Sequence, residues 1–230
     1  DKKSNRDTRR SMIVGIGTAM ACAALVTPLA ANAQSRGQGR GFQAPSHDID
    51  TWMDELSGNH RIFIDTSTGT GGAEALLYAA NLNNATTTAY AGEDASLAII
   101  VCYRHFSTPF AFNDGMWEKY GEIFHTVTGI ADPNTSAAPR INLMQTASYG
   151  LNLPSFGNTI DSARQSGVEI AICDAATQFL SSQIGPATGQ EIQDVYEELK
   201  ANAVPGRFVS AGVMALTRAQ EYGYSLLYAG

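Results

Sequence analysis

Short apolar runs alternate with segments of helical pattern along residues 59–230. Five runs rich in β-branched and aromatic residues predict strands, namely Arg61–Asp65, Ser96–Tyr103, Val168–Cys173, Arg207–Ser210 and Tyr224–Tyr228. The stretches between them have the spacing of helices, at Ala73–Leu82, Gly115–Thr128, Gly157–Gln165, Ala175–Ile184, Gln190–Asn202 and Val213–Gly223. This alternation predicts one α/β domain, a three-layer sandwich around a mostly parallel five-stranded sheet.

The connections between these elements carry weaker signals. Thr66–Gly72 is a glycine-rich turn between a strand and a helix, where backbone N–H groups are able to hold an anion. Its spacing matches neither a P-loop nor a dinucleotide fingerprint, so a plain β–α turn is the alternative. Asn83–Glu93 is polar and predicts a loop. Ile130–Pro154 is a long irregular segment marked by prolines, which is typical of a lid or an oligomer contact.

Two acidic residues and two aromatic residues have expected structural roles. Asp114 and Asp174 each directly precede a helical segment, and both are suited to cap it. Trp117 and Phe124 lie on one side of the helix predicted at Gly115–Thr128, and we expect them to pack in the core.

Cys173 occupies the position where such a sheet usually carries chemistry. It ends a strand whose apolar run indicates burial on both faces, and a helix follows it. Open α/β sheets bind ligands at the carboxyl ends of their strands, and a helix N-terminus favours a thiolate over a thiol. Free cysteine is also among the most buried residue types, so simple core packing is the alternative role.

Asp65 and His105 are expected at the same edge of the sheet as Cys173. Asp65 ends the first strand and His105 closely follows the second. A thiol, an imidazole and a carboxylate that converge there would suit nucleophilic or persulfide chemistry. The alternative for His105 is a loop histidine bonded to the backbone. Asp174, next in sequence to Cys173, completes the candidate ligand-binding set of Asp65, His105 and Asp174.

The first residues have the pattern of an export signal. Thr8–Met12 contains a twin-arginine core, Ile13–Ala31 is apolar, and Ala31–Ala33 forms an A-x-A cleavage site. These features predict a Tat signal peptide over residues 1–33 and a periplasmic mature protein. An uncleaved membrane anchor is the alternative. Residues 34–58 are rich in Gly, Gln, Arg and polar side chains and predict a flexible linker before the domain at 59–230.

The charge of the chain limits its partners. The formal net charge is −7, and residues 1–33 carry five basic and two acidic side chains, which leaves about −10 on the remainder. A net negative charge on the residues after 33 argues against nucleic acid and against an anionic membrane surface as partners.

The C-terminal part has a recognisable order of features. A small-residue turn at Ser210–Val213 precedes a helix with a Leu216-x-x-x-Gln220 pattern, and Gly223-Tyr224 opens the last strand. Together with the order of elements, this resembles the DsrE/DsrF-like (YchN-like) family over roughly residues 59–230, with the long middle loop as an insertion. The segments Arg104–Phe110 and Asn113–Gly121 are similar to a Tat-exported, uncharacterised branch of that family.

The resemblance implies a fold and a chemistry. The family fold is a flavodoxin-like α/β sandwich that assembles into homo- or hetero-oligomers. Its best understood members relay sulfur as a persulfide on a cysteine placed like Cys173. They act in the cytoplasm, whereas this chain carries an export signal. In addition, Asp174 directly follows the cysteine here, and its negative charge opposes a thiolate.

The remaining cysteines and histidines indicate neither a disulfide nor a metal centre. Of the three cysteines, Cys22 lies in the predicted signal, so the mature residues include only Cys102 and Cys173. Cys102 lies inside the apolar run of the second strand and is expected in the core. The resemblance places the first strand between those of Cys102 and Cys173, about 9.5 Å apart, which is beyond disulfide reach and predicts two separate thiols. No CxxC or CxxCH occurs and no histidines pair closely, so structural zinc or c-type haem is not expected and we assign no cofactor.

These observations lead to one main hypothesis and two alternatives. The main hypothesis is a periplasmic, homo-oligomeric DsrE-like protein that binds a small sulfur species or transfers persulfide sulfur through Cys173. No nucleic acid partner and no membrane insertion after signal cleavage are expected. The first alternative is a non-catalytic periplasmic small-molecule binding or assembly module with the same fold and a packed Cys173. The second is a flavin or nucleotide binder.

Overall fold

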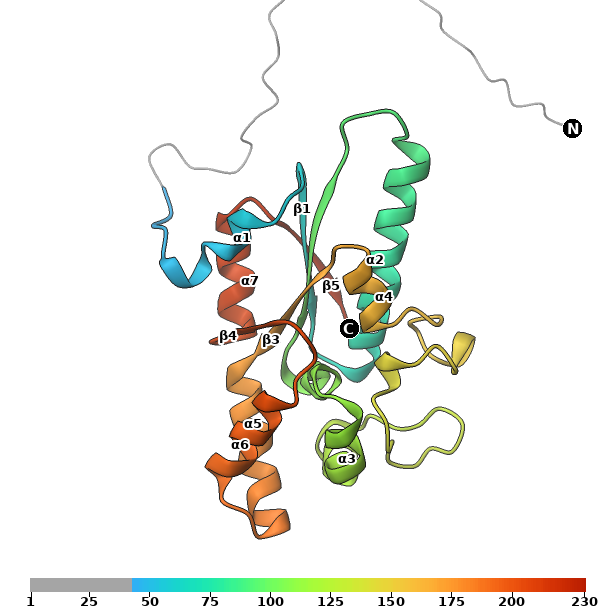
Figure 1. Cartoon of the computed structure of the whole chain (residues 1–230), viewed down its shortest axis with the longest axis vertical. Helices are drawn as coiled ribbons and strands as arrows, with labels where there is room; N and C mark the ends of the chain where they lie inside the picture. Colours follow the sequence, from blue (N-terminus) through green and yellow to red (C-terminus); the bar gives the residue numbers. More distant parts are fainter. Residues whose placement is uncertain (1–42) are drawn as a thin grey trace, which may run out of the picture. The chain divides into compact units, whose positions relative to one another are not determined.

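The computed structural model describes residues 43–230 and contains a five-stranded sheet in which every strand pairing is parallel (Figure 1). The strand order is β4-β3-β2-β1-β5. The strands are β1 (His60–Thr66), β2 (Leu97–Tyr103), β3 (Glu169–Cys173), β4 (Arg207–Val209) and β5 (Ser225–Ala229). Each predicted apolar run forms a strand, and the predicted α/β sandwich with a flavodoxin-like parallel sheet is confirmed. The predicted signal at residues 1–33 lies outside the described residues.

Helices cover both faces of the sheet. Along β1 to β4 the connections pack on one face and comprise α2 (Gly69–Ala89), α3 (Asp114–Thr128), α4 (Ile160–Gln165), α5 (Asp174–Thr188) and α6 (Ile192–Ala201). After β4 the chain crosses the opposite face through α7 (Gly212–Glu221) and returns as β5 at the other edge (Figure 1). The short α1 (Trp52–Glu55) packs on the same face as α7.

The strands β1, β2 and β3 are largely buried on both faces, which explains their apolar runs. In β2, Val101 and Tyr103 face the layer of α2 to α6, whereas Ile100 and Cys102 face α1 and α7. The larger face carries an aromatic cluster whose members stack or meet edge to face: Tyr103, Phe110, Phe112, Trp117, Tyr120 and Phe124. Trp117 and Phe124 are fully buried, so their predicted core positions are confirmed.

The folded unit begins earlier than the sequence predicts. It starts at Ala44, and part of the segment predicted as a flexible linker forms a short 3₁₀ helix and α1. Met53 in α1 is completely buried, and its carbonyl accepts a 2.6 Å hydrogen bond from the Tyr224 hydroxyl. Arg218 of α7 forms a 2.9 Å ion pair with Asp50. Polar composition predicted flexibility for this segment, but Met53 and its neighbour Trp52 supply enough apolar area to hold it on the sheet.

Two helix boundaries also differ from the prediction. α2 continues to Ala89, so most of the predicted loop Asn83–Glu93 is helical. Its last turns are polar because they are largely exposed, and Thr87 and Thr88 return hydrogen bonds to the preceding turn. Asp114 does not cap α3. Asn113 does so by accepting from the Met116 amide.

The long connection between α3 and α4 contains only two short 3₁₀ helices, Leu143–Gln145 and Gly150–Asn152. Asn142 is fully buried and anchors it, donating 2.7 Å hydrogen bonds to the carbonyls of Phe110 and Phe112. Within the part of the chain that the structure describes, no helix combines the length and apolarity needed to cross a membrane.

Candidate functional site

A cavity of about 320 Å³ opens at the carboxyl ends of β2 and β3. Its wall combines the residues that follow β2, the start of α5 and the start of α7, namely Arg104, His105, Phe106, Cys173, Ala175, Ala176, Phe179, Ala211, Gly212 and Val213. The structure therefore brings the predicted site residues Cys173 and His105 to one cavity. This is the sheet edge at which open α/β proteins bind ligands.

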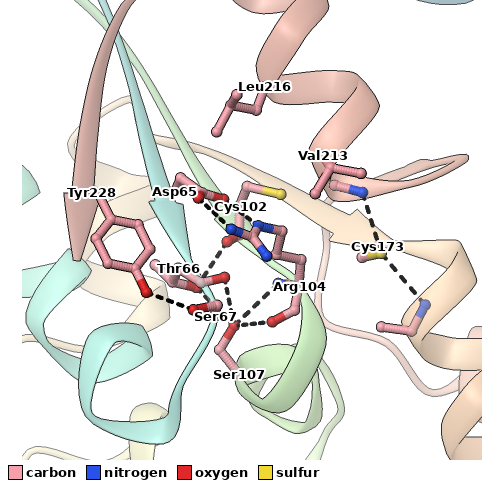
Figure 2. A network of polar contacts seen from close by, with 12 residues as sticks. Asp65, Thr66, Ser67, Cys102, Arg104, Ser107, Cys173, Val213, Leu216 and Tyr228 are labelled. Atoms are coloured by element: carbon pink, nitrogen blue, oxygen red, sulfur yellow. Dashed lines mark hydrogen bonds and ion pairs between the residues drawn. The ribbon is translucent and has the colours of Figure 1, made fainter. Parts of the chain in front are cut away.

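The sulfur of Cys173 lies between two helix N-termini. Cys173 Sγ accepts hydrogen bonds from the Gly212 amide at 3.2 Å and from the Ala176 amide at 3.4 Å (Figure 2). Gly212 is the first residue of α7, and Ala176 lies in the first turn of α5. Amide N–H groups and helix N-termini both stabilise negative charge. This corner of the fold thus presents two backbone N–H donors and two helix N-termini to the sulfur of Cys173.

Cys173 itself is the N-cap of α5, a role that the sequence assigned to Asp174. Asp174 is instead the first residue of the helix, and its carboxylate turns toward α6. It accepts hydrogen bonds from the Tyr196 hydroxyl at 2.7 Å and from Lys200 Nζ at 3.1 Å. Asp174 does not line the cavity, and Lys200 offsets the negative charge that was expected to oppose a thiolate.

Asp65 is not among the residues that line the cavity. Its carboxylate is almost completely buried and forms a two-point pair with Arg104, with Nε–Oδ1 at 2.6 Å and Nη2–Oδ2 at 2.7 Å (Figure 2). The hydrogen bonds to Asp65 raise the pKa of Arg104, and this effect exceeds the opposite effect of partial burial. Asp65 therefore acts on the cavity through Arg104.

His105 is exposed at the rim of the cavity, where the chain leaves β2 and enters a 3₁₀ helix. Its backbone has φ +54°, in the left-handed region that few side chains adopt. Its ring packs on Phe106, with 4.1 Å between the ring centroids. Both oxygens of Asp65 bond to Arg104, and Cys173 Sγ bonds to two backbone amides. The expected thiol–imidazole–carboxylate triad is therefore not connected by hydrogen bonds.

Cys102 is a core residue, as predicted. It is fully buried on the α7 face of the sheet, and burial, followed by the charge of Asp65, raises the pKa of its thiol well above the usual range. Both Cys102 and Cys173 are free thiols. The expected strand order was wrong, because β2 and β3 are neighbours and β1 does not separate them. The thiols stay apart because Cys102 pairs with Ala171, two residues before Cys173. That offset puts the two Cα atoms about 8 Å apart.

The glycine-rich turn after β1 is explained by packing. Thr68 caps α2 by accepting a 2.9 Å hydrogen bond from the Gly71 amide. A Cβ atom on Gly71 would lie 2.2 Å from the Ala229 carbonyl oxygen, so only glycine lets α2 start this close to the end of β5. A second cavity of about 360 Å³ lies beside the turn and under the long connection. These contacts fit the plain β–α turn, and no bound anion is needed to account for the glycines.

Sequence reasoning missed four residues of the site. Arg104 directly precedes His105, and its role depends on the pairing of β2 with β1. Gly212 approaches Cys173 only because α7 crosses the opposite face of the sheet. Phe179 and Val213 line the cavity with side chains that are about half exposed. The sequence does point to Phe179 and Val213, because each is an apolar residue near the N-terminus of a helix that follows a strand.

Comparison of the chain with protein-family models, with curated proteins and with solved structures gives no match. In residues 43–230, no group of three or more His, Cys, Asp or Glu side chains is arranged to hold a metal ion.

The Asp174 interactions predict a pH-dependent stability. Burial raises the pKa of Asp174, but hydrogen bonds from Tyr196, Lys200 and Gln178 outweigh it and bring the pKa below the ordinary 3.8. A carboxyl with a lowered folded pKa stabilises the protein above its unfolded pKa and loses this effect as pH falls through the folded value. Asp174→Asn should lower the free energy of unfolding by about 1–2 kcal/mol at pH 7. The difference should shrink below about pH 4.

Urea denaturation between pH 3 and pH 7 measures this difference. Asp161→Asn is the matched control, because the Asp161 side chain is 63% exposed and only 3.7 Å from Arg164 in an i, i+3 pair. Such surface pairs contribute little, so the control should follow the wild type at every pH. A constant destabilisation of Asp174→Asn across the pH range would contradict the assigned role of its charge.

Proposed function

We propose that the protein is a periplasmic, DsrE-like protein that binds a small sulfur species or transfers persulfide sulfur through Cys173. The observation that carries this proposal is the position of Cys173 Sγ in a cavity wall, with amide donors from the starts of α5 and α7 at 3.4 and 3.2 Å. Two converging helix N-termini stabilise a thiolate at Sγ, and the thiolate is the nucleophile that sulfur transfer requires.

The transfer step needs only a nucleophilic sulfur and a donor. The Cys173 thiolate attacks the outer, sulfane sulfur of the donor, a new S–S bond forms, and the S–S bond of the donor breaks. The donor's leaving group takes the electron pair, and Cys173 becomes a persulfide. No outside oxidant or reductant is required. A thiol acceptor reverses the exchange by attacking the outer sulfur of the persulfide.

Homo-oligomer formation and export complete the proposal. β5 is an edge strand with two exposed apolar side chains, Leu226 at 46% and Tyr228 at 53%. An apolar edge strand is a suitable surface for a second copy of the chain. The periplasmic location rests on the twin-arginine pattern of residues 1–33.

The alternative function is a binding or assembly module in which Cys173 has only a packing role. The low exposure of Cys173, 6%, is the observation that favours it. In that case the two amide hydrogen bonds would serve as helix capping, and the cavity would bind its ligand without covalent chemistry.

Intact mass after incubation with inorganic polysulfide separates the two functions. The wild type and Cys102→Ala should gain sulfur that a reductant removes, whereas Cys173→Ala should gain none. Cys102→Ala is the matched control because Cys102 is a second free thiol that is fully buried. Alkylation of the native protein should map to Cys173. If Cys173 resists both polysulfide and alkylation until the protein unfolds, the transfer function is overturned in favour of the binding module.

A further inference from the structure

The wall around Cys173 is mainly apolar. Phe179 from α5 and Val213 from α7 are 47% and 58% exposed, and both line the cavity together with Phe106 and three alanines. Large apolar side chains that remain exposed at a concave site gain free energy when a ligand covers them. The cavity therefore has an apolar surface that a small inorganic sulfur species would leave in contact with water.

Apart from His105, whose ring is exposed at the rim and packs on Phe106, the polar groups near the cavity are engaged by the protein itself. Arg104 uses Nε and Nη2 to bind both oxygens of Asp65. The Gly212 and Ala176 amides point to Cys173 Sγ, and Asp174 turns away to Tyr196 and Lys200 on α6. A ligand that depends on several oxygen contacts would have to displace these bonds, whereas an apolar group does not.

We infer that the sulfur donor is an organic sulfane compound with an apolar body, such as an aryl or branched-alkyl thiosulfonate or hydropersulfide. This inference rests on the proposed transfer through Cys173. The sulfane sulfur is placed at Cys173 Sγ, and the apolar body covers Phe179, Val213 and Phe106. A volume of about 320 Å³ is at the lower end of small-molecule sites and has room for a single ring.

The transfer from such a donor balances without a further reactant. With benzenethiosulfonate, C₆H₅–SO₂–S⁻, the Cys173 thiolate bonds to the terminal sulfur and the bond between that sulfur and the sulfonyl sulfur breaks. Benzenesulfinate, C₆H₅–SO₂⁻, leaves with the electron pair, and Cys173–S–S⁻ remains. Two negative charges enter the step and two leave it, and no proton is transferred.

Three donors that differ in the group bearing the sulfane sulfur test the inference: inorganic thiosulfate, methanethiosulfonate and benzenethiosulfonate. Persulfide formation on Cys173 is followed by intact mass, and each rate is divided by that of the same donor with free cysteine to remove intrinsic reactivity. The wild type should favour benzenethiosulfonate over methanethiosulfonate by roughly 10- to 100-fold, because only the ring covers the apolar wall.

Substitution at the cavity rim locates the origin of this preference. Phe179→Ser should lower the preference for the benzene donor over the methane donor by roughly tenfold. Ile192→Ser is the matched control, because Ile192 lies on α6, is also 47% exposed and does not line the cavity. The control should retain the wild-type preference.

The outcomes distinguish the choice of an organic donor from the proposed sulfur transfer through Cys173. Loading of Cys173 at equal normalised rates from all three donors, or a preference that Phe179→Ser does not change, overturns the organic donor and leaves sulfur transfer intact. If none of the three donors and no polysulfide load Cys173, both the transfer function and the donor assignment fail together.

Discussion

Replacing Asp65 with alanine should lower the free energy of unfolding by about 3 kcal/mol, because it leaves a partly buried charge without its partner. The Asp65 side chain is 3% exposed and the Arg104 side chain 21%, and two hydrogen bonds of 2.6 and 2.7 Å join them. Pairs of this two-point geometry are among the stronger polar interactions in proteins. Urea denaturation at pH 7, followed by circular dichroism, measures the loss.

Asp54→Ala provides the matched control for this prediction. Asp54 also pairs with an arginine, Arg61, at 2.7 Å, but its side chain is 65% exposed. Exposed pairs typically contribute less than about 1 kcal/mol, so this variant should remain close to the wild type. Similar losses of unfolding free energy for the two variants would show that burial does not strengthen the Asp65–Arg104 pair.

Gly212→Ala is expected to slow sulfur loading of Cys173 by roughly tenfold or more, because the added Cβ atom displaces either the start of α7, which carries the amide donor, or the stem of Arg104. A Cβ atom at this position would lie 2.6 Å from Arg104 Cβ and 2.8 Å from Arg104 Cδ. Either the start of α7 or the stem of Arg104 has to shift, and both line the cavity beside Cys173. Overpacking of this kind costs about 1–3 kcal/mol of stability.

Loading kinetics and urea denaturation are measured on the same preparations to separate reactivity from folding. Met214→Ala is the control, because Met214 lies two residues further along α7, is 55% exposed and does not line the cavity. It should load at the wild-type rate. If Gly212→Ala folds and loads as fast as this control, the close packing of the start of α7 against Arg104 has no part in the reactivity of Cys173.

The sheet could be predicted from sequence because its physical cause is local. Strands covered on both faces favour apolar side chains at most positions, and short runs of β-branched residues such as Ile99–Val101 are typical of them. Helix ends were harder to predict. The end of α2 is polar and exposed, so nothing in its pattern distinguishes it from a loop. The buried α1 was hidden in a polar segment for the same reason.

The candidate site could be predicted only in part. Cys173 and His105 follow from one rule, that parallel strands end at a common edge where ligands bind. The partner of Asp65 depends on register, because Asp65 pairs with Cys102 and Arg104 comes two residues later. The contact of Gly212 with Cys173 depends on the face that α7 crosses. Strand order and crossover side are global properties, and no short segment of the sequence records them.

The position of β5 has a consequence for how the chain folds. β1 pairs with β2 on one side and with β5 on the other, and the β5 partner of Ile62 is Ser225. Closing a loop of about 160 residues is slow, so the pairing with β5 should form late. Until then β1 is an open edge with apolar side chains such as Phe63 and Ile64, and a chain held at that stage is the species most prone to self-association. The last strand thus completes the sheet and also protects its first strand from aggregation.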